Sequence, residues 1–488
     1  MFQKSFKALL ICERNRFTAS LLLVFLLAAF VLFSRIDLEK AKVHADEPGW
    51  VASGYIHTEL LINLISKRKF DLAPWQQKDS YFAMNGQIGK WLLGFPISIY
   101  FRAVHDQRAL SYNDLTVPSF SALTHLLWDD LHAGKKSAQV PILLSRSVSA
   151  FFGILCSLLV FLIGYSCSGI LVGIVSVVLL LSNHLFVISA TRAMTDVYYL
   201  FFLLCACLSS ARFIKEGKEG PILSMRLSIL WGVFSALAAS VKVTGVLVGG
   251  FYFCVYALFE KLFMKPSKFF APVIAFACSA LIVIYLMNPA FWIPVSSLKP
   301  GEIAQESKTL ARALVERFKG DKTAIQVDQY PQLENLFRFS QVFLEWNHVM
   351  KEQQENISKG IWKLNQQEFG MTIEVQILKG GIKRVEKINK MFFYLFSPFP
   401  FVGILFLISG LAVCIWETVK KISEDRSIPP CAALFFFFVA NYVFILGTLK
   451  LNWDRYFLTT VVSAQMIAGL GLVAVGKNLL TKLLRTRS

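Results

Sequence analysis

Asp46 and Glu47 are adjacent carboxylates that follow the first apolar segment of the chain by about a dozen residues. A carboxylate just outside a membrane can take a proton from an incoming acceptor, at the depth where a lipid-soluble substrate exposes its polar end. From spacing alone, the solvated start of a loop is the more ordinary interpretation of the same pair. The choice between these interpretations depends on the segments that position the pair.

The composition is that of an integral membrane protein. The chain is 55% hydrophobic, contains 44 Phe and has a mean hydropathy of +0.54, which is far above the values of soluble proteins. A helix needs ~20 mainly apolar residues to cross a bilayer. Ten segments are predicted to do so, at 17–34, 142–163, 168–189, 196–211, 227–241, 243–259, 269–288, 391–416, 429–448 and 457–475.

Charge fixes the predicted orientation. With ten crossings, both termini and the turns on their side of the membrane hold 18 basic and 7 acidic residues, so the positive-inside rule places them in the cytoplasm. Merging 227–259 into one span would move the basic turn 260–268 and the C-terminal tail outside. We therefore predict two helices there.

The predicted organisation has two long outward-facing loops. The segments are a cytoplasmic N-terminus 1–16, a first transmembrane helix 17–34 kept as a signal anchor, a loop 35–141, a transmembrane core 142–288, a second loop 289–390, C-terminal transmembrane helices 391–475 and a basic cytoplasmic tail 476–488. Short helices are expected at 50–66 and 88–101, the latter along the outer leaflet. None of the nine cysteines lies in either loop, which favours a bacterial inner membrane. The tail is suited to anionic lipid headgroups rather than to nucleic acid.

Charged residues gather at the outward edges of the predicted spans. They are Arg146, Arg192, Lys242, Lys450, Arg455, Asp196 and Asp454. An ionised group costs ~2.5–3.5 kcal/mol at the bilayer centre and less near the interface, so it usually has a partner. The excess of cations indicates an anionic ligand such as a phosphate, which arginine binds with two parallel donors. Alternatively, these side chains extend to lipid headgroups. In the predicted helix 50–66, His57 beside Glu59 is a weak metal signal.

Five short motifs occur in order along the chain. They are Ala45-Asp46-Glu47-Pro48-Gly49-Trp50, Asn85-Gly86-Gln87-Ile88-Gly89-Lys90-Trp91-Leu92-Leu93-Gly94, Ala190-Thr191-Arg192-Ala193-Met194-Thr195-Asp196, Ser240-Val241-Lys242-Val243-Thr244-Gly245 and Arg455-Tyr456. In these motifs the chain resembles GT-C-fold glycosyltransferases that use polyprenyl-phosphate sugars, in particular the protein O-mannosyltransferase and aminoarabinose-transferase superfamily. The second motif lacks the paired prolines of the family.

The resemblance implies an all-α polytopic membrane protein with a GT-C-like bundle of about ten transmembrane helices and extracytoplasmic juxtamembrane helices in the first loop. It also implies inverting sugar transfer from a polyprenyl-phosphate donor to a lipid, glycan or protein of the cell envelope. Asp46 would be the general base, with Glu47 orienting it or helping to bind a divalent metal, which the resemblance leaves open. The implied donor-phosphate ligands are Lys90, Arg192, Lys242, Arg455 and Tyr456, and the implied supporting residues are His57, Arg146 and Asp196.

Two other classes of function compete with this one. A transporter or flippase of a lipid-linked anion would also need many helices and ionisable groups, but it should carry those groups near mid-membrane. Here they gather at one face. A non-catalytic scaffold is the second alternative. The missing prolines in the Lys90 motif leave it open, whereas Asp46 and Arg455 argue against it.

Overall fold

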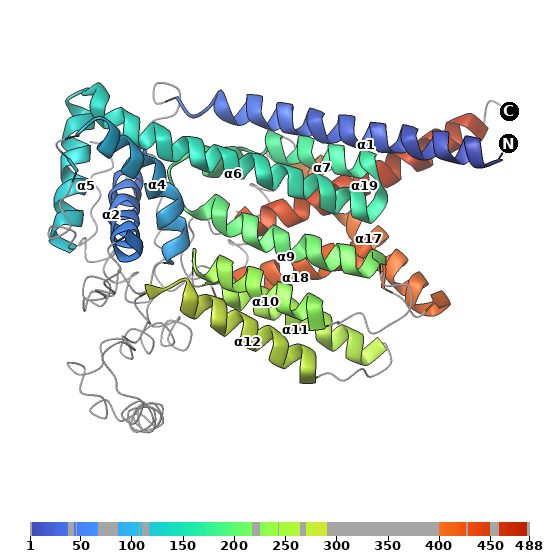
Figure 1. Ribbon diagram of the computed structural model, residues 1–488. Coiled ribbons are helices and arrows are strands. Elements are labelled where there is room, and N and C mark those ends of the chain that lie inside the picture. Colours follow the sequence, from blue (N-terminus) through green and yellow to red (C-terminus); the bar gives the residue numbers. More distant parts are fainter. Residues whose placement is uncertain are drawn as a thin grey trace, which may run out of the picture.

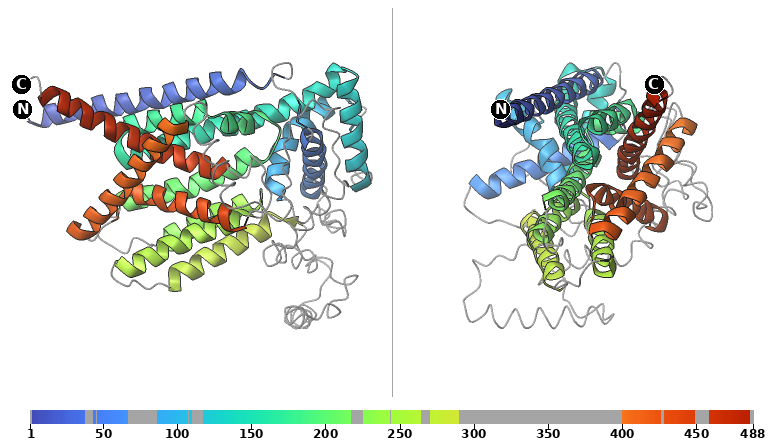
Figure 2. Two further views of the ribbon diagram at one scale, coloured as in Figure 1. Left: turned by 180° about the vertical axis from the view of Figure 1, so that it is seen from behind. Right: turned by 90° about the vertical axis from the view of Figure 1, so that its right-hand side faces the viewer.

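The protein is a helical bundle with three helices across one end. The computed structural model describes residues 2–37, 43–44, 46–66, 86–106, 108–109, 117–216, 225–242, 244–263, 270–289, 400–425, 428–448 and 458–485. Every element assigned within these ranges is a helix. The described ends of the chain lie together at the end of the bundle opposite the three crossing helices (Figures 1 and 2).

The bundle and its cap are built from separate parts of the sequence. The bundle helices are α1 (Phe2–Phe33), α6 (Lys136–Ser168), α7 (Ile170–Ser182), α8 (His184–Thr191), α9 (Asp196–Glu216), α10 (Met225–Ala239), α11 (Thr244–Phe263), α12 (Phe270–Leu286), α17 (Pro400–Asp425), α18 (Pro430–Thr448) and α19 (Leu458–Arg485). The cap helices are α2 (Asp46–Ser66), α4 (Gln87–Ala103) and α5 (Val117–His132). All three cap helices come from the predicted first loop.

Several of the described bundle helices have the length and composition of membrane spans. Among the described residues, 4 helices are long and apolar enough to cross a membrane on their own, at Glu13–Phe33, Lys136–Ser168, Val402–Glu424 and Leu458–Thr481. The bent pair α7 and α8 is long and apolar enough when its two helices are taken together. Shorter apolar helices lie in α10, α11, α12 and α18. The chain is thus an integral membrane protein of the all-α class. Each of the ten predicted spans overlaps a described helix, although ten crossings, and their direction, stay a prediction.

The predicted span at 168–189 is divided into two helices in the structure. The chain breaks at Asn183, and α7 and α8 meet at an angle of 74°. Asn183 has an extended backbone, and its side-chain oxygen accepts a hydrogen bond from the Phe186 N–H at 3.1 Å. Asparagine favours this N-cap geometry, which starts a new helix. By contrast, the predicted division of 227–259 into two helices is confirmed by α10 and α11.

The helix α5 is an addition to the predicted fold. Residues 117–132 lie within the segment treated as loop between the short helix at 88–101 and the span at 142–163. The helix is short and mixes apolar with polar residues, so its apolar content alone does not mark it. Leu123 and Leu127 of this helix are buried in the main hydrophobic core. The helical structure of this segment therefore depends on packing against α2 and α6.

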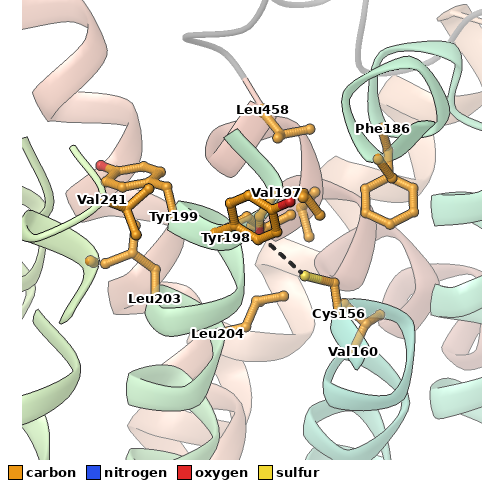
Figure 3. Close-up of a cluster of buried hydrophobic side chains, with 14 of the residues drawn as sticks. Cys156, Val160, Phe186, Val197, Tyr198, Tyr199, Leu203, Leu204, Val241 and Leu458 are labelled. Atoms are coloured by element: carbon orange, nitrogen blue, oxygen red, sulfur yellow. Dashed lines mark hydrogen bonds between the residues drawn. The ribbon is translucent and has the colours of Figure 1, made fainter. Parts of the chain in front are cut away.

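An apolar cluster fixes the start of α9 inside the bundle (Figure 3). The thiol of Cys156 on α6 donates to the Val197 carbonyl at 3.7 Å. The Tyr198 hydroxyl is hydrogen-bonded to Ser149 at 3.0 Å, and its ring packs edge-on against Phe152. Such edge contacts add ~0.5–1.5 kcal/mol to the burial of the rings. Asp196, the first residue of α9, is consequently held in a fixed position.

Candidate functional site

The two long cap helices touch backbone to backbone. A Cβ on Gly94 of α4 would lie 1.9 Å from the carbonyl oxygen of Gly54 on α2, and a Cβ on Gly54 would lie 2.9 Å from the Lys90 carbonyl oxygen. No side chain other than hydrogen fits at such a crossing. The crossing sets α4 at a fixed height on α2 and brings the Lys90 segment against the first half of α2.

The start of α4 rests on two turns of the bundle. The Ile88 N–H donates to the Ser240 carbonyl at 3.0 Å, and a Cβ on Gly86 would lie 2.1 Å from Ser240 carbonyl atoms. A Cβ on Gly89 would lie 2.7 Å from the Thr195 side chain. Three sequence motifs, those of Lys90, of Arg192 and Asp196, and of Lys242, therefore meet at the capped end of the bundle.

A buried ion pair joins the cap to α6. Glu47 and Arg146 have fully buried side chains, with Nε to Oε2 at 3.0 Å and Nη2 to Oε1 at 3.2 Å. Arg146 also donates from Nη1 to the Ile36 carbonyl at 3.1 Å. Burial raises the pKa of the Glu47 carboxyl, and the Arg146 charge opposes that rise. The pair ties the first turn of α2 to the bundle and so positions Asp46.

Asp46 is in a different environment from Glu47. Its side chain is 38% exposed, and its backbone N–H donates to His44 Nδ1 at 3.1 Å. The same ring nitrogen lies 3.9 Å from Asp46 Oδ2. The sequence predicted Asp46 as a general base, with Glu47 orienting it or helping to bind a divalent metal. In the structure Asp46 can be reached by a substrate, whereas Glu47 is enclosed with Arg146.

Arg192 is the cation beside these carboxylates. It follows α8 as its C-cap and is partly buried. Burial lowers the pKa of its guanidinium, while Glu47 and Asp46 raise it and Arg146 lowers it further. Within the described ranges of the chain, the Arg192 side chain makes no hydrogen bond or ion pair. A guanidinium withdrawn from water in this way is suited to an anionic ligand.

A second ion pair joins α9 to the turn after α10. Lys242 Nζ donates to Asp196 Oδ1, and Asp196 is buried. Next to this pair, the Thr244 hydroxyl donates to the Tyr199 hydroxyl at 3.4 Å. Arg146 and Lys242, two of the five edge cations, therefore link elements of the fold through ion pairs with carboxylates.

His57 and Lys90 lie together in the interior of the cap. Lys90 Nζ is 3.2 Å from His57 Nε2, and both side chains are buried. Glu59, which the sequence placed beside His57, instead accepts hydrogen bonds from Ser98 and Arg102. The sequence pattern gives no signal for either of these contacts between α2 and α4. Among the described residues, no group of three or more His, Cys, Asp and Glu side chains is arranged to hold a metal ion.

Two predicted donor-phosphate ligands cannot be placed. Arg455 and Tyr456 lie outside the described residues, as do Lys450 and Asp454. The same holds for residues 290–399, which contain nearly all of the predicted second loop.

Most of the residues at the capped end fall within a known family model. Residues 88–296 match the model described as dolichyl-phosphate-mannose-protein mannosyltransferase. The expected resemblance is confirmed. The match to mannosyltransferases covers less than half of the chain and includes Lys90, Arg146, Arg192, Asp196 and Lys242, while Asp46 and Glu47 precede it. No curated protein matches the sequence significantly.

Two solved structures are similar over most of the chain. One is the oligosaccharyltransferase AglB of Archaeoglobus fulgidus in complex with an inhibitory peptide and a dolichol-phosphate, at 13% identity and a TM-score of 0.48. The other is ArnT of Cupriavidus metallidurans bound to undecaprenyl phosphate, at 11% identity and a TM-score of 0.48. Each alignment covers 96% of this chain, but only 52% and 63% of the respective solved chain.

Proposed function

We propose that the protein is a membrane glycosyltransferase that moves a sugar from a polyprenyl-phosphate donor to an envelope lipid, glycan or protein on the extracytoplasmic side of a bacterial inner membrane. The match of residues 88–296 to a mannosyltransferase model supports the class of enzyme. The capped end, opposite the chain termini, is the proposed outward end, because the basic termini favour the cytoplasm.

One observation carries the proposal. The accessible carboxylate of Asp46 lies close enough to Arg192 that its charge, with that of Glu47, raises the pKa of the guanidinium, against the lowering that burial causes. Arg192 makes no ion pair within the part of the chain that the structure describes. A base and a nearby cation at one end of a membrane bundle are the groups that sugar transfer from a lipid phosphate requires.

The proposed reaction follows from this arrangement. Asp46 takes the proton of an acceptor hydroxyl or amine as that atom attacks the anomeric carbon, and the bond from that carbon to the phosphate oxygen breaks with inversion. Charge then develops on the departing polyprenyl phosphate. Arg192, with Lys90 and Lys242 and with Arg455 and Tyr456 as further proposed ligands, stabilises that charge, because fixed cations need little rearrangement.

The remaining proposed residues support this site. Glu47 and Arg146 hold the first turn of α2 in place, and Asp196 holds Lys242. His57 contacts Lys90. The proposal includes no required metal, and a divalent ion would have to be detected by dependence of transfer on added Mg²⁺ or Mn²⁺ after chelation.

The test is sugar transfer by purified protein from radiolabelled polyprenyl-phosphate sugars to an envelope extract. Asp46→Asn removes the base and keeps the shape of the side chain, so transfer should fall at least 100-fold, the lower range for loss of general base catalysis. Asp129→Asn is the matched control, because Asp129 is an exposed carboxylate on α5 of the same cap and should leave the rate unchanged.

The outcomes separate the alternatives. Equal transfer by wild type and Asp46→Asn would exclude Asp46 as the base. Absence of transfer with every donor, together with movement of the donor across reconstituted vesicles, would replace the enzyme by a flippase.

A further inference from the structure

His57 has two contacts that define its chemical state. Its Nδ1 lies 2.7 Å from the Ser53 carbonyl oxygen, one helical turn earlier on α2. A carbonyl oxygen only accepts, so Nδ1 carries a hydrogen and donates it. The other nitrogen, Nε2, lies 3.2 Å from Lys90 Nζ.

The contact with Lys90 requires a lone pair on the ring. The Lys90 ammonium has three hydrogens and accepts nothing, so Nε2 must be the acceptor and His57 must be neutral. Burial and the Lys90 charge both lower the pKa of His57 well below its ordinary value, which agrees with this assignment. His57 therefore receives a hydrogen bond from Lys90 without adding a charge to the cap.

The surrounding backbone holds the ring in this position. His57 is 1% exposed and Lys90 is fully buried. Gly54 and Gly94 place α2 and α4 in backbone contact one turn away on either helix, so neither side chain can move aside without separating the helices. A lysine side chain otherwise has ~2 kcal/mol of rotamer entropy to lose when it is fixed.

We propose that His57 is a positioning residue for donor binding, in that its Nε2 orients the Lys90 ammonium toward the donor phosphate. The inference rests on the proposed function, since it assigns Lys90 to that phosphate. The hydrogen bond from Lys90 Nζ to His57 Nε2 fixes the rotation of the ammonium group about its Cε–Nζ bond. If His57 only filled space in the core, its contribution would depend on its volume. An aromatic ring without a lone pair would then leave donor binding unchanged, whereas it should weaken donor binding if His57 positions Lys90.

The test is binding of radiolabelled undecaprenyl phosphate to the purified full-length protein in lipid nanodiscs. His57→Phe keeps a ring and removes the acceptor, and it should weaken binding about tenfold, the effect of losing one hydrogen bond to a charged group. His57→Gln restores an acceptor oxygen near the position of Nε2 and should recover most of the affinity. Ile56→Ala, a change at a buried neighbour on α2, should lower thermal stability without weakening binding.

Lys90→Ala separates failure of this inference from failure of the proposed function. The inference is supported when Lys90→Ala and His57→Phe both weaken binding and His57→Gln does not. It is overturned when Lys90→Ala weakens binding but His57→Phe binds as wild type does, or when His57→Phe, His57→Gln and Ile56→Ala weaken binding alike. Wild-type protein that fails to bind undecaprenyl phosphate would overturn the proposed function itself. Should His57→Phe not fold, His57→Leu compared with His57→Gln gives the same contrast.

Discussion

Replacing Arg146 by methionine would leave the Glu47 carboxylate buried without its strongest partner. The two side chains are fully buried and share two hydrogen bonds at 3.0 and 3.2 Å. Removing one member of a buried pair costs ~3–5 kcal/mol, because the other charge stays without compensation. We expect Arg146→Met to destabilise the protein by about that amount, and Glu47→Gln combined with Arg146→Met to recover part of it.

The expected loss depends on pH with a defined sign. Burial raises the pKa of Glu47 and Arg146 lowers it, so loss of Arg146 raises the pKa further. A carboxyl with a folded-state pKa above its unfolded value loses stability as pH rises through that interval, by up to about 1.4 kcal/mol per pH unit for one proton. The deficit of Arg146→Met should therefore be larger at pH 8 than at pH 5.

The assay is unfolding of purified protein in mixed micelles at both pH values, followed with a thiol-reactive dye, because described cysteines such as Cys156 and Cys207 are buried. Arg102→Met is the matched control. Arg102 also forms two bonds to a glutamate of α2, but its side chain is 54% exposed, and exposed pairs contribute ~0.2–1 kcal/mol. Equal losses in the two variants, or a deficit for Arg146→Met that does not shrink at pH 5, would refute the reasoning.

Three further predictions concern other parts of the fold. Gly94→Ala should destabilise the protein by ~1–3 kcal/mol through overpacking, because the new Cβ would lie 1.9 Å from the Gly54 oxygen. Gly476→Ala in α19, which has open space around it, should be neutral or stabilising in the same unfolding assay. Asn183→Ala should lower the stability by ~1 kcal/mol because it removes the cap of α8, and Asn183→Asp should retain that stability. Equal melting temperatures of the two variants would contradict this prediction. Arg192→Met should weaken undecaprenyl phosphate binding at least tenfold without loss of stability, since Arg192 makes no ion pair among described residues; a stability loss like that of Arg146→Met would show that its charge serves the fold instead.

Residue types and their order along the chain are enough to predict the class of protein and the order of its helices. Apolar length and charge bias are local properties, and they were enough to separate α10 from α11 and to predict the short helices at 50–66 and 88–101. The motifs around Lys90, Arg192 and Lys242 were also visible as short strings, and they fall in the region that matches a mannosyltransferase model.

Which charged side chains meet depends on how the helices pack. Glu47 and Arg146 are 99 positions apart in the chain, and His57 and Lys90 are 33 apart. The first pair joins α2 to α6, and the second depends on the height at which α2 crosses α4, which the Gly54 and Gly94 backbones set. The break at Asn183 was likewise hidden, because the apolar run continues across it while one side-chain hydrogen bond caps the start of a new helix. Charge pairing at a distance and the bending of an apolar segment both arise from packing, which a one-dimensional pattern of residue types does not contain.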